Sequence, residues 1–193
     1  MNRGSLVVAQ AAYLFLPLVG SAICSAVVLA GDRWGWLKRP LDFGVTVRGR
    51  RLLGDNKTWR GLACAWLGSV AAVAIQHGIG SDAGSLAVID YSAASVVALG
   101  TAYGLGATIG ELPNSFVKRQ LGIAPGGKPT GALVPVLYVW DQVDVLLAIW
   151  PLLLWWVRPS PALVVASFGV VFVVHQVISV VGFLIGVRRS PGW

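Results

Sequence analysis

The chain has 193 residues, of which 56% are hydrophobic and 12% are charged. A soluble domain carries about 25% charged residues, so this composition excludes a soluble domain and indicates one integral membrane domain over residues 1–193. The net charge of +7 does not indicate a nucleic-acid partner, because the basic residues lie in short segments between apolar runs, as membrane topology signals do.

Five runs of about 20 apolar residues predict an all-α protein with five transmembrane helices. They cover residues 6–30, 61–79, 93–109, 134–157 and 162–187. The first run is much longer than the apolar region of a signal peptide, so we expect it to be retained. In the fourth run, Pro135 and Pro151 are expected to bend or break the helix.

The basic residues between these runs predict the orientation of the chain. Residues 31–60 contain eight Lys and Arg residues, whereas residues 80–92 contain none. Cytoplasmic loops are rich in Lys and Arg, so we expect the N-terminus outside and the C-terminus in the cytoplasm. This orientation places 13 of the 15 basic residues in the cytoplasm and leaves Arg3 and Arg158 outside. It describes a multi-pass protein of the cell membrane.

Glycine and proline mark the third run and the segment after it. Gly100 and Gly104 are four residues apart, a spacing that lets helices approach closely. From Gly110 to Gly131, Gly and Pro are frequent, which indicates irregular backbone. Irregular backbone persists at membrane depth only when it is buried or lines a wet cavity, so we expect a pocket there.

Two charged segments stand out from the apolar background, and we call residues 48–61 the first and residues 110–144 the second. A charge at the centre of a bilayer costs about 2.5–3.5 kcal/mol on insertion scales, so charged groups beside membrane spans are candidates for function. The predicted orientation places both segments on the cytoplasmic side, where nucleotides are available. We therefore expect the two segments to form one active site.

Asp141 and Asp144 are three residues apart, so they share one face of a helix. Two neighbouring carboxylates suit Mg²⁺, which is often bound by one or two carboxylates together with substrate phosphates. Glu111, at the cytoplasmic end of the third run, is a candidate for a further metal ligand. The alternative is that these are solvated charges at helix ends that pair with Lys or Arg.

The basic residues of the two segments are candidates for binding phosphate groups, because Arg offers a bidentate fork and Lys a compact charge. The candidates are Arg50, Arg51, Lys57, Arg60, Lys118 and Arg119. The last two are expected at the start of a helix, pointing in different directions. The alternative is attraction to anionic lipid, worth about 1 kcal/mol per residue near the surface. His77 and His175 lie in or near apolar runs and are expected to be packed and hydrogen-bonded.

Two motifs in the second segment resemble the cytidylyltransferases that make CDP-lipids. These are Ser115-Phe116-Val117-Lys118-Arg119 and, after a loop, Asp141-Gln142-Val143-Asp144. The turn after Arg119 and the run Gly54-Asp55-Asn56-Lys57-Thr58 in the first segment are similar to the CDP-archaeol synthase family. The resemblance covers most of the chain.

This resemblance implies a Mg²⁺-dependent enzyme that transfers CMP from CTP to a membrane lipid phosphate. It implies catalytic roles for Asp141, Asp144, Lys118 and Arg119, with Glu111 as a further metal ligand beside the two aspartates. The residues expected to bind substrate are Arg51, Asn56, Lys57, Thr58, Arg60 and Ser115. The expected partners are CTP, the lipid phosphate and the membrane, with a homodimer as one option.

The chain also differs from the family pattern. Glu111 stands where an aspartate is common, and residues 127–140 form a longer and more apolar loop. The acceptor therefore stays open between an archaeal-type isoprenoid glycerol phosphate and a phosphatidate-like lipid. The alternative function is a non-catalytic membrane protein that binds or transports anionic lipid.

Overall fold

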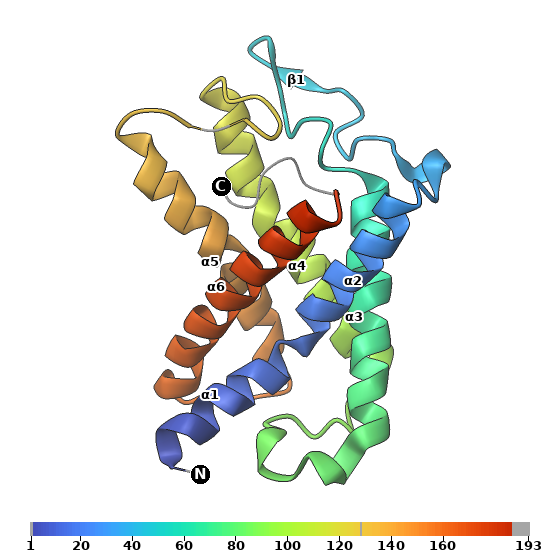
Figure 1. Ribbon diagram of the computed structural model, residues 1–193, viewed down its shortest axis with the longest axis vertical. Coiled ribbons are helices and arrows are strands. Elements are labelled where there is room, and N and C mark those ends of the chain that lie inside the picture. The colour runs from blue at the N-terminus through green and yellow to red at the C-terminus, as the bar shows by residue number, and fades with distance from the viewer. Residues whose placement is uncertain (1, 128, 187–193) are drawn as a thin grey trace.

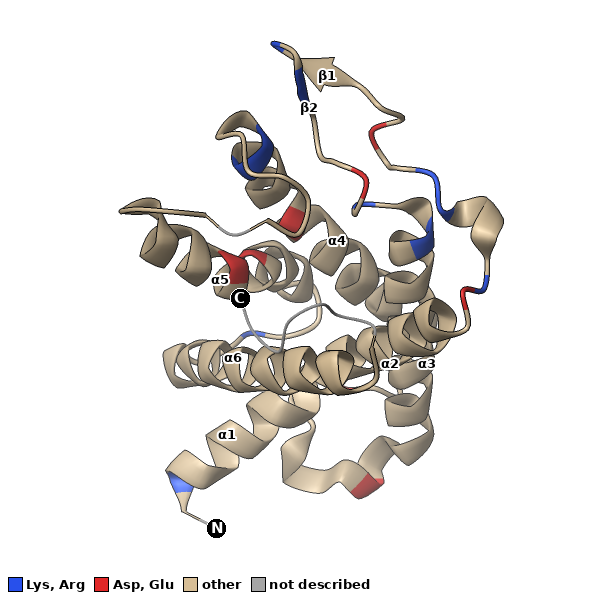
Figure 2. Ribbon diagram, turned by 45° about the horizontal axis from the view of Figure 1, so that its top comes forward, with Lys and Arg blue, Asp and Glu red and all other residues tan. Residues whose placement is uncertain are grey.

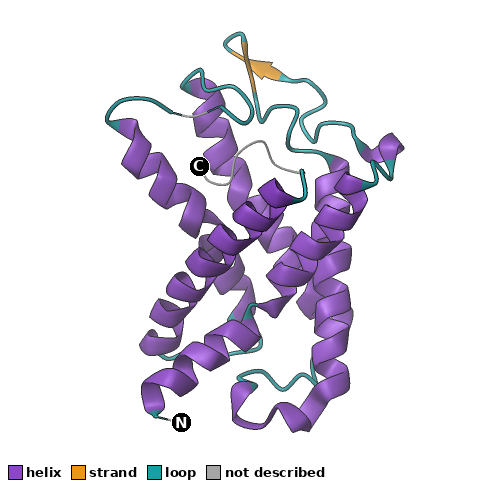
Figure 3. Ribbon diagram, in the orientation of Figure 1, coloured by secondary structure: helices purple, strands orange, loops and turns teal. Residues whose placement is uncertain are grey.

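The structure is a computed structural model that describes residues 2–127 and 129–186. Its regular structure is almost all helix, which confirms the all-α class (Figures 1 and 3). The helices are α1 (Arg3–Leu14), α2 (Leu16–Ala30), α3 (Trp59–Ile79), α4 (Val96–Gln120), α5 (Leu133–Leu153) and α6 (Pro161–Leu184). The remaining elements are two 3₁₀ segments, η1 (Gly35–Leu37) and η2 (Gly80–Leu86), and a hairpin of β1 (Thr46–Val47) with β2 (Arg50–Arg51).

The helices run between two ends of the molecule, and one end carries most of the loops. Residues 31–58, with the hairpin, and the described residues 121–127 and 129–132 lie there, at the top of Figure 1, and we call it the loop end. The charged positions also gather toward this end (Figure 2). The two charged segments thus lie on the same side of the protein. Three of the basic residues expected in the cytoplasm lie outside the described residues, namely Lys128, Arg188 and Arg189.

Three helical segments are long and apolar enough to cross a membrane, namely α3 with η2, α5 and α6. The pair α1 and α2, bent by 41°, forms a fourth if it makes a single crossing. The expected third span lies in α4, which does not meet the same test, because four glycines and the charged residues Glu111, Lys118 and Arg119 reduce its apolar character. The count of five spans stays a prediction.

The break between α1 and α2 follows from Pro17. Proline has no backbone N–H, so the carbonyl group of Tyr13 loses its partner in the helix. The Gln76 side chain donates to that carbonyl at 2.6 Å, and the Tyr103 hydroxyl donates to the neighbouring carbonyl of Leu14 at 2.6 Å. Both donors are buried, so α3 and α4 stabilise the bend where α1 and α2 meet.

Helix α4 packs against α2, α3 and α5, and its glycines allow this close approach. A Cβ atom on Gly104 would lie 2.5 Å from the Cα of Trp66 on α3. A Cβ on Gly110 would lie 2.4 Å from the backbone oxygen of Asp144 on α5. The structure thus confirms the role predicted from glycine spacing. Because α4 is enclosed by other helices, it does not need a fully apolar surface.

Three local expectations were wrong. The backbone is regular through Gly110 and Pro113, because α4 continues to Gln120. Among the described residues, the irregular backbone of this region is limited to 121–127 and 129–132, and residues 133–140 of the expected loop are helical because α5 begins at Leu133. Lys118 and Arg119 therefore lie in the last turn of a helix and not at the start of one. In α5, Pro135 lies in the first turn, where no N–H donor is needed, and Pro151 lies close to the C-terminal end, so neither residue breaks the helix.

Candidate active site

The first charged segment contacts the carboxyl-terminal half of α4 at two points. Lys57 forms an ion pair with Glu111, although 54 positions separate them in the sequence. The Arg50 guanidinium donates to the backbone oxygen of Gln120, and the Gln120 side chain donates to the backbone oxygen of Arg51 at 3.4 Å. These contacts hold residues 48–58 over the carboxyl-terminal half of α4. The two charged segments therefore contact each other, and the expectation that they form one active site stays a prediction.

Asp42 organises residues 31–58 between α2 and α3, which we call the first loop, although its sequence context does not mark it as a site residue. Its side chain is fully buried and accepts from Arg51 Nη2 at 2.7 Å and from the backbone N–H groups of Gly44, Leu53 and Gly54 at 2.8–3.2 Å. Burial alone would raise the pKa of Asp42. The Arg51 guanidinium and the three backbone N–H groups outweigh burial, so its pKa lies well below the ordinary value.

Asp141 and Asp144 are held together by a residue that sequence reasoning missed. The side-chain amide of Asn114, on α4, donates to Asp144 Oδ2 at 2.9 Å and also to Asp141 Oδ1. Lys118 forms an ion pair with Asp141. Asn114 lies one helical turn before Lys118, so the same helix face that carries the recognised Lys could have pointed to it. The two carboxylates therefore converge, as their spacing predicted.

The oxygen atoms around this pair fit the chemistry of a hard cation. Asn114 is 3% exposed, and its Oδ1 atom is buried without a hydrogen-bond partner. Two carboxylates and a free amide oxygen are ligands that Mg²⁺ accepts. The residues that the structure describes contain no group of three His, Cys, Asp or Glu side chains close enough to hold a metal, and Glu111 pairs with Lys57 instead. A ligand role for Glu111 stays a prediction.

Lys118 and Arg119 point in different directions, as expected for neighbours on a helix. Arg119 is 7% exposed, and its Nε and Nη1 atoms have no hydrogen-bond partner among the described residues. Its side chain lies beside Gly54, where a Cβ atom would be 3.4 Å from Arg119 Cδ and 2.9 Å from Pro125 Cγ. Two unpaired nitrogen atoms on a buried guanidinium are costly, and a phosphate group would satisfy them.

The other expected substrate residues divide into two groups. The first group has structural contacts. Arg51 pairs with Asp42 and Asp55. Thr58 caps α3 by accepting from the Gly61 N–H at 3.1 Å. Arg60 donates to Asp32 and to the Arg33 carbonyl near the end of α2. Asn56 lies next to Gly54, and Ser115 is buried on α4 one position after Asn114. Their roles in substrate binding stay predictions.

The chain is similar to one family of known proteins over nearly its whole length. The family described as CarS-like CDP-archaeol synthase matches residues 5–191. The CDP-archaeol synthase of Halobacterium salinarum strain R1 is 35% identical over 177 residues, covering 86% of this chain and 88% of that protein. The CDP-archaeol synthase of Aeropyrum pernix is 34% identical over 187 residues, covering 94% and 91%.

A solved structure supports the same assignment. It is described as an intramembrane enzyme for archaeal membrane lipid biosynthesis, and it matches with a TM-score of 0.61 and 29% identity, covering 86% of this chain and 89% of that one. The likeness in fold and the likeness in sequence each cover most of the chain. The chain therefore belongs to the CDP-archaeol synthase family.

Proposed function

We propose that this protein transfers CMP from CTP to a membrane lipid phosphate, giving a CDP-lipid and pyrophosphate. The observation that carries the proposal is the convergence of Asp141 and Asp144 on Asn114 beside Lys118. The names of the similar proteins point to an archaeal-type isoprenoid glycerol phosphate as the acceptor. A phosphatidate-like lipid fits the same chemistry.

The reaction needs no nucleophile from the protein. An oxygen of the lipid phosphate attacks the α-phosphorus of CTP, a new O–P bond forms, and the bond to the β-phosphate oxygen breaks, so that pyrophosphate leaves. The protein must bring two anionic groups together and stabilise the charge on the triphosphate. A site rich in carboxylates and basic residues, without a Ser/His pair, suits this task.

Specific side chains have proposed roles in this reaction. Asp141 and Asp144, with Glu111 as a further candidate, hold Mg²⁺, which offsets negative charge on the triphosphate. Arg119 and Lys57 contact phosphate groups, and Lys118 keeps Asp141 in place until substrate binds. Arg51, Asn56, Thr58, Arg60 and Ser115 complete the proposed substrate site.

We also propose that the loop end faces the cytoplasm. There a soluble nucleotide and a membrane-bound acceptor can reach the same site. The basic residues of 31–60 support this orientation, since cytoplasmic loops are enriched in Lys and Arg.

The proposal is tested with purified protein, labelled CTP, Mg²⁺ and a panel of lipid phosphates that includes an isoprenoid glycerol phosphate and a diacyl phosphatidate. The expected result is a labelled CDP-lipid with at least one acceptor, formed only when Mg²⁺ is present. The matched control is Asp144→Asn, which is expected to remain folded and to form no product.

Folded protein that makes no CDP-lipid with any acceptor would contradict the proposal. A melting temperature that does not change with CTP and Mg²⁺ would then favour the alternative, a non-catalytic protein that binds or transports anionic lipid.

A further inference from the structure

The most apolar helix of the protein carries polar side chains that the proposed reaction does not use. α6 contains His175 and Gln176 within a span of mean hydropathy 2.3. Polar groups inside a membrane are costly unless they are hydrogen-bonded, so their presence needs an explanation. Both side chains contact Gln142, which lies on α5 between Asp141 and Asp144.

The hydrogen bonds define a three-residue cluster, Gln142 with His175 and Gln176, which we call the amide–imidazole cluster. Gln142 Oε1 accepts from Gln176 Nε2 at 3.1 Å and lies 2.9 Å from His175 Nδ1. An amide oxygen only accepts, so Nδ1 of His175 carries the proton in this contact. Gln142 is 6% exposed, whereas His175 and Gln176 are partly buried, so the cluster joins α5 to α6 through a buried acceptor.

The cluster and the carboxylates lie on different faces of α5. Successive residues on an α-helix are rotated by about 100°, so Gln142 projects about 100° from Asp141 and about 160° from Asp144 around the helix. Asn114 and Lys118 of α4 hold the carboxylate side of α5, and the two α6 residues hold the other side. The rotation of α5 about its axis is thus fixed by polar contacts from both neighbours.

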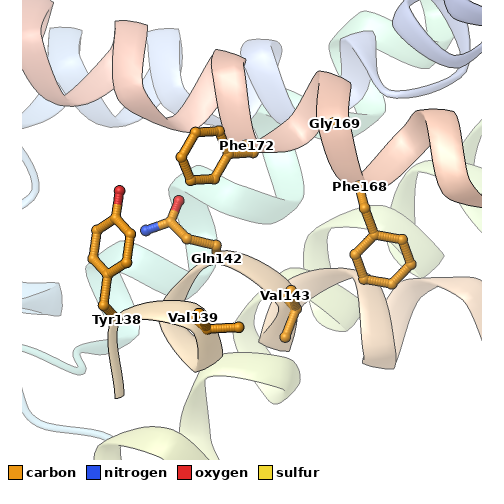
Figure 4. Close-up of a pocket in the computed structure, with 7 residues that line it drawn as sticks. All are labelled: Tyr138, Val139, Gln142, Val143, Phe168, Gly169 and Phe172. Atoms are coloured by element: carbon orange, nitrogen blue, oxygen red, sulfur yellow. The ribbon is translucent and has the colours of Figure 1, made fainter. Parts of the chain in front are cut away.

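The apolar packing around the cluster is incomplete. A cavity of about 290 Å³ lies between α5 and α6, lined by Tyr138, Val139, Gln142, Val143, Phe168, Gly169 and Phe172 (Figure 4). The rings of Tyr138 on α5 and Phe172 on α6 pack edge to face, with their centroids 6.4 Å apart. A partly open interface does not hold a helix rotation as firmly as a close-packed one, so the hydrogen bonds to Gln142 contribute more here.

We propose that the amide–imidazole cluster positions the active-site carboxylates by fixing the rotation of α5. A side-chain oxygen lies about 6 Å from a helix axis, so a rotation of about 10° moves it by about 1 Å. Misplacement by about 1 Å can reduce turnover by about 100-fold. Gln142, His175 and Gln176 are positioning residues, and this role depends on the proposed cytidylyltransferase reaction.

The test compares two replacements of His175 that differ in where they place a donor. The side-chain amide nitrogen of Asn occupies the position of Nδ1, so His175→Asn keeps the bond to Gln142. The amide nitrogen of Gln corresponds to Nε2, so His175→Gln loses that bond. We expect kcat of His175→Asn within about threefold of the wild type, and kcat of His175→Gln and Gln142→Leu at least 10-fold lower.

A second readout separates positioning from simple folding. Displaced carboxylates bind the cation less well, so the Mg²⁺ concentration for half-maximal rate should rise at least fivefold in Gln142→Leu, whereas KM for CTP changes less. The melting shift on adding Mg²⁺ and CTP should shrink in the same variant. The matched control is His77→Asn. His77 Nδ1 also has a hydrogen bond, 2.7 Å long, to the Tyr91 carbonyl, and it lies at the end of α3 away from the loop end.

Three outcomes would overturn the proposal. The first is equal rates for His175→Asn and His175→Gln. The second is a Gln142→Leu variant that folds in lower yield, but whose folded fraction keeps the wild-type kcat and the wild-type Mg²⁺ concentration for half-maximal rate. The third is an inactive but folded His175→Asn, since that would assign the imidazole a proton-transfer role. A wild-type protein without activity would instead contradict the proposed reaction itself.

Discussion

Lys57 and Glu111 form an ion pair that connects the first loop to α4. Their side chains are 18% and 45% exposed, and pairs with that exposure contribute about 0–1 kcal/mol to stability. The pair is therefore poorly explained as a stabilising contact. It does place a Lys beside Glu111 of α4, one turn before Asn114.

We predict that Lys57→Met lowers kcat/KM for CTP by about 100-fold while changing the melting temperature little, because a charged contact to phosphate is lost. Steady-state kinetics and thermal melting measure both effects. Lys38→Met is the control, since Lys38 also pairs with a carboxylate, that of Asp32, but outside the proposed site. Equal losses in the two variants would remove Lys57 from the site.

Asn114→Leu should leave Asp141 and Asp144 facing each other without a shared donor. Losing the donor to a buried carboxylate costs about 1–3 kcal/mol, so the melting temperature should fall. A cation between the carboxylates can replace the lost donor, so Mg²⁺ should restore part of the loss. Gln76→Leu, which loses a hydrogen bond to the Tyr13 carbonyl far from the site, should show no such recovery. Recovery in both variants, or in neither, would argue against a cation site at this pair.

Gly110→Ala should push α5 away from α4, because the new Cβ would lie 2.4 Å from the backbone oxygen of Asp144. Overpacking of this kind costs about 1–3 kcal/mol, and the displaced Asp144 should also lower turnover. Gly78→Ala, in α3, has nothing within 4 Å of its new Cβ and should be neutral or slightly stabilising. Thermal melting and CDP-lipid assays on both variants check this. A Gly110→Ala variant with normal turnover would show that the helix contact tolerates displacement.

The stability contributed by Asp42 should depend on pH. Its pKa is well below the ordinary value of about 3.9, so as pH falls the unfolded chain binds the proton before the folded protein does. The contribution is therefore complete above about pH 4 and is lost as the pH falls through the folded pKa. Melting temperatures of the wild type and Asp42→Asn should differ near neutral pH and converge in acid. A difference that persists unchanged at low pH would show that the charge on Asp42 is not the cause.

The orientation of the protein can be tested by labelling single cysteines in membrane vesicles of known sidedness. Arg48→Cys lies in the exposed hairpin of the loop end, and Ser85→Cys lies in η2 at the opposite end. An impermeant thiol reagent should reach Arg48→Cys only from the cytoplasmic side and Ser85→Cys only from outside. The reverse pattern would contradict the proposed orientation.

The positions of the helices followed from the sequence because each long apolar run must be shielded from water as a unit. The boundaries were less accurate where polar chemistry overrode the apolar pattern. α4 extends beyond the expected end at residue 109 to Gln120, because its last turns are held by contacts with α5 and the first loop. The bend between α1 and α2 needed Gln76 and Tyr103 as distant partners, and these donors cannot be identified from local sequence.

The sequence by itself identified the charged residues whose free-energy cost beside a membrane span marks them as candidates for function. Those were the carboxylates Asp141 and Asp144 and the basic residues Lys57, Lys118 and Arg119. Only the tertiary structure decided how they pair. Asn114 joins the two carboxylates, Asp42 shapes the loop, and Gln142 is bonded to His175. These are contacts between helices and loops far apart in the chain, and their geometry depends on packing, which residue spacing does not encode.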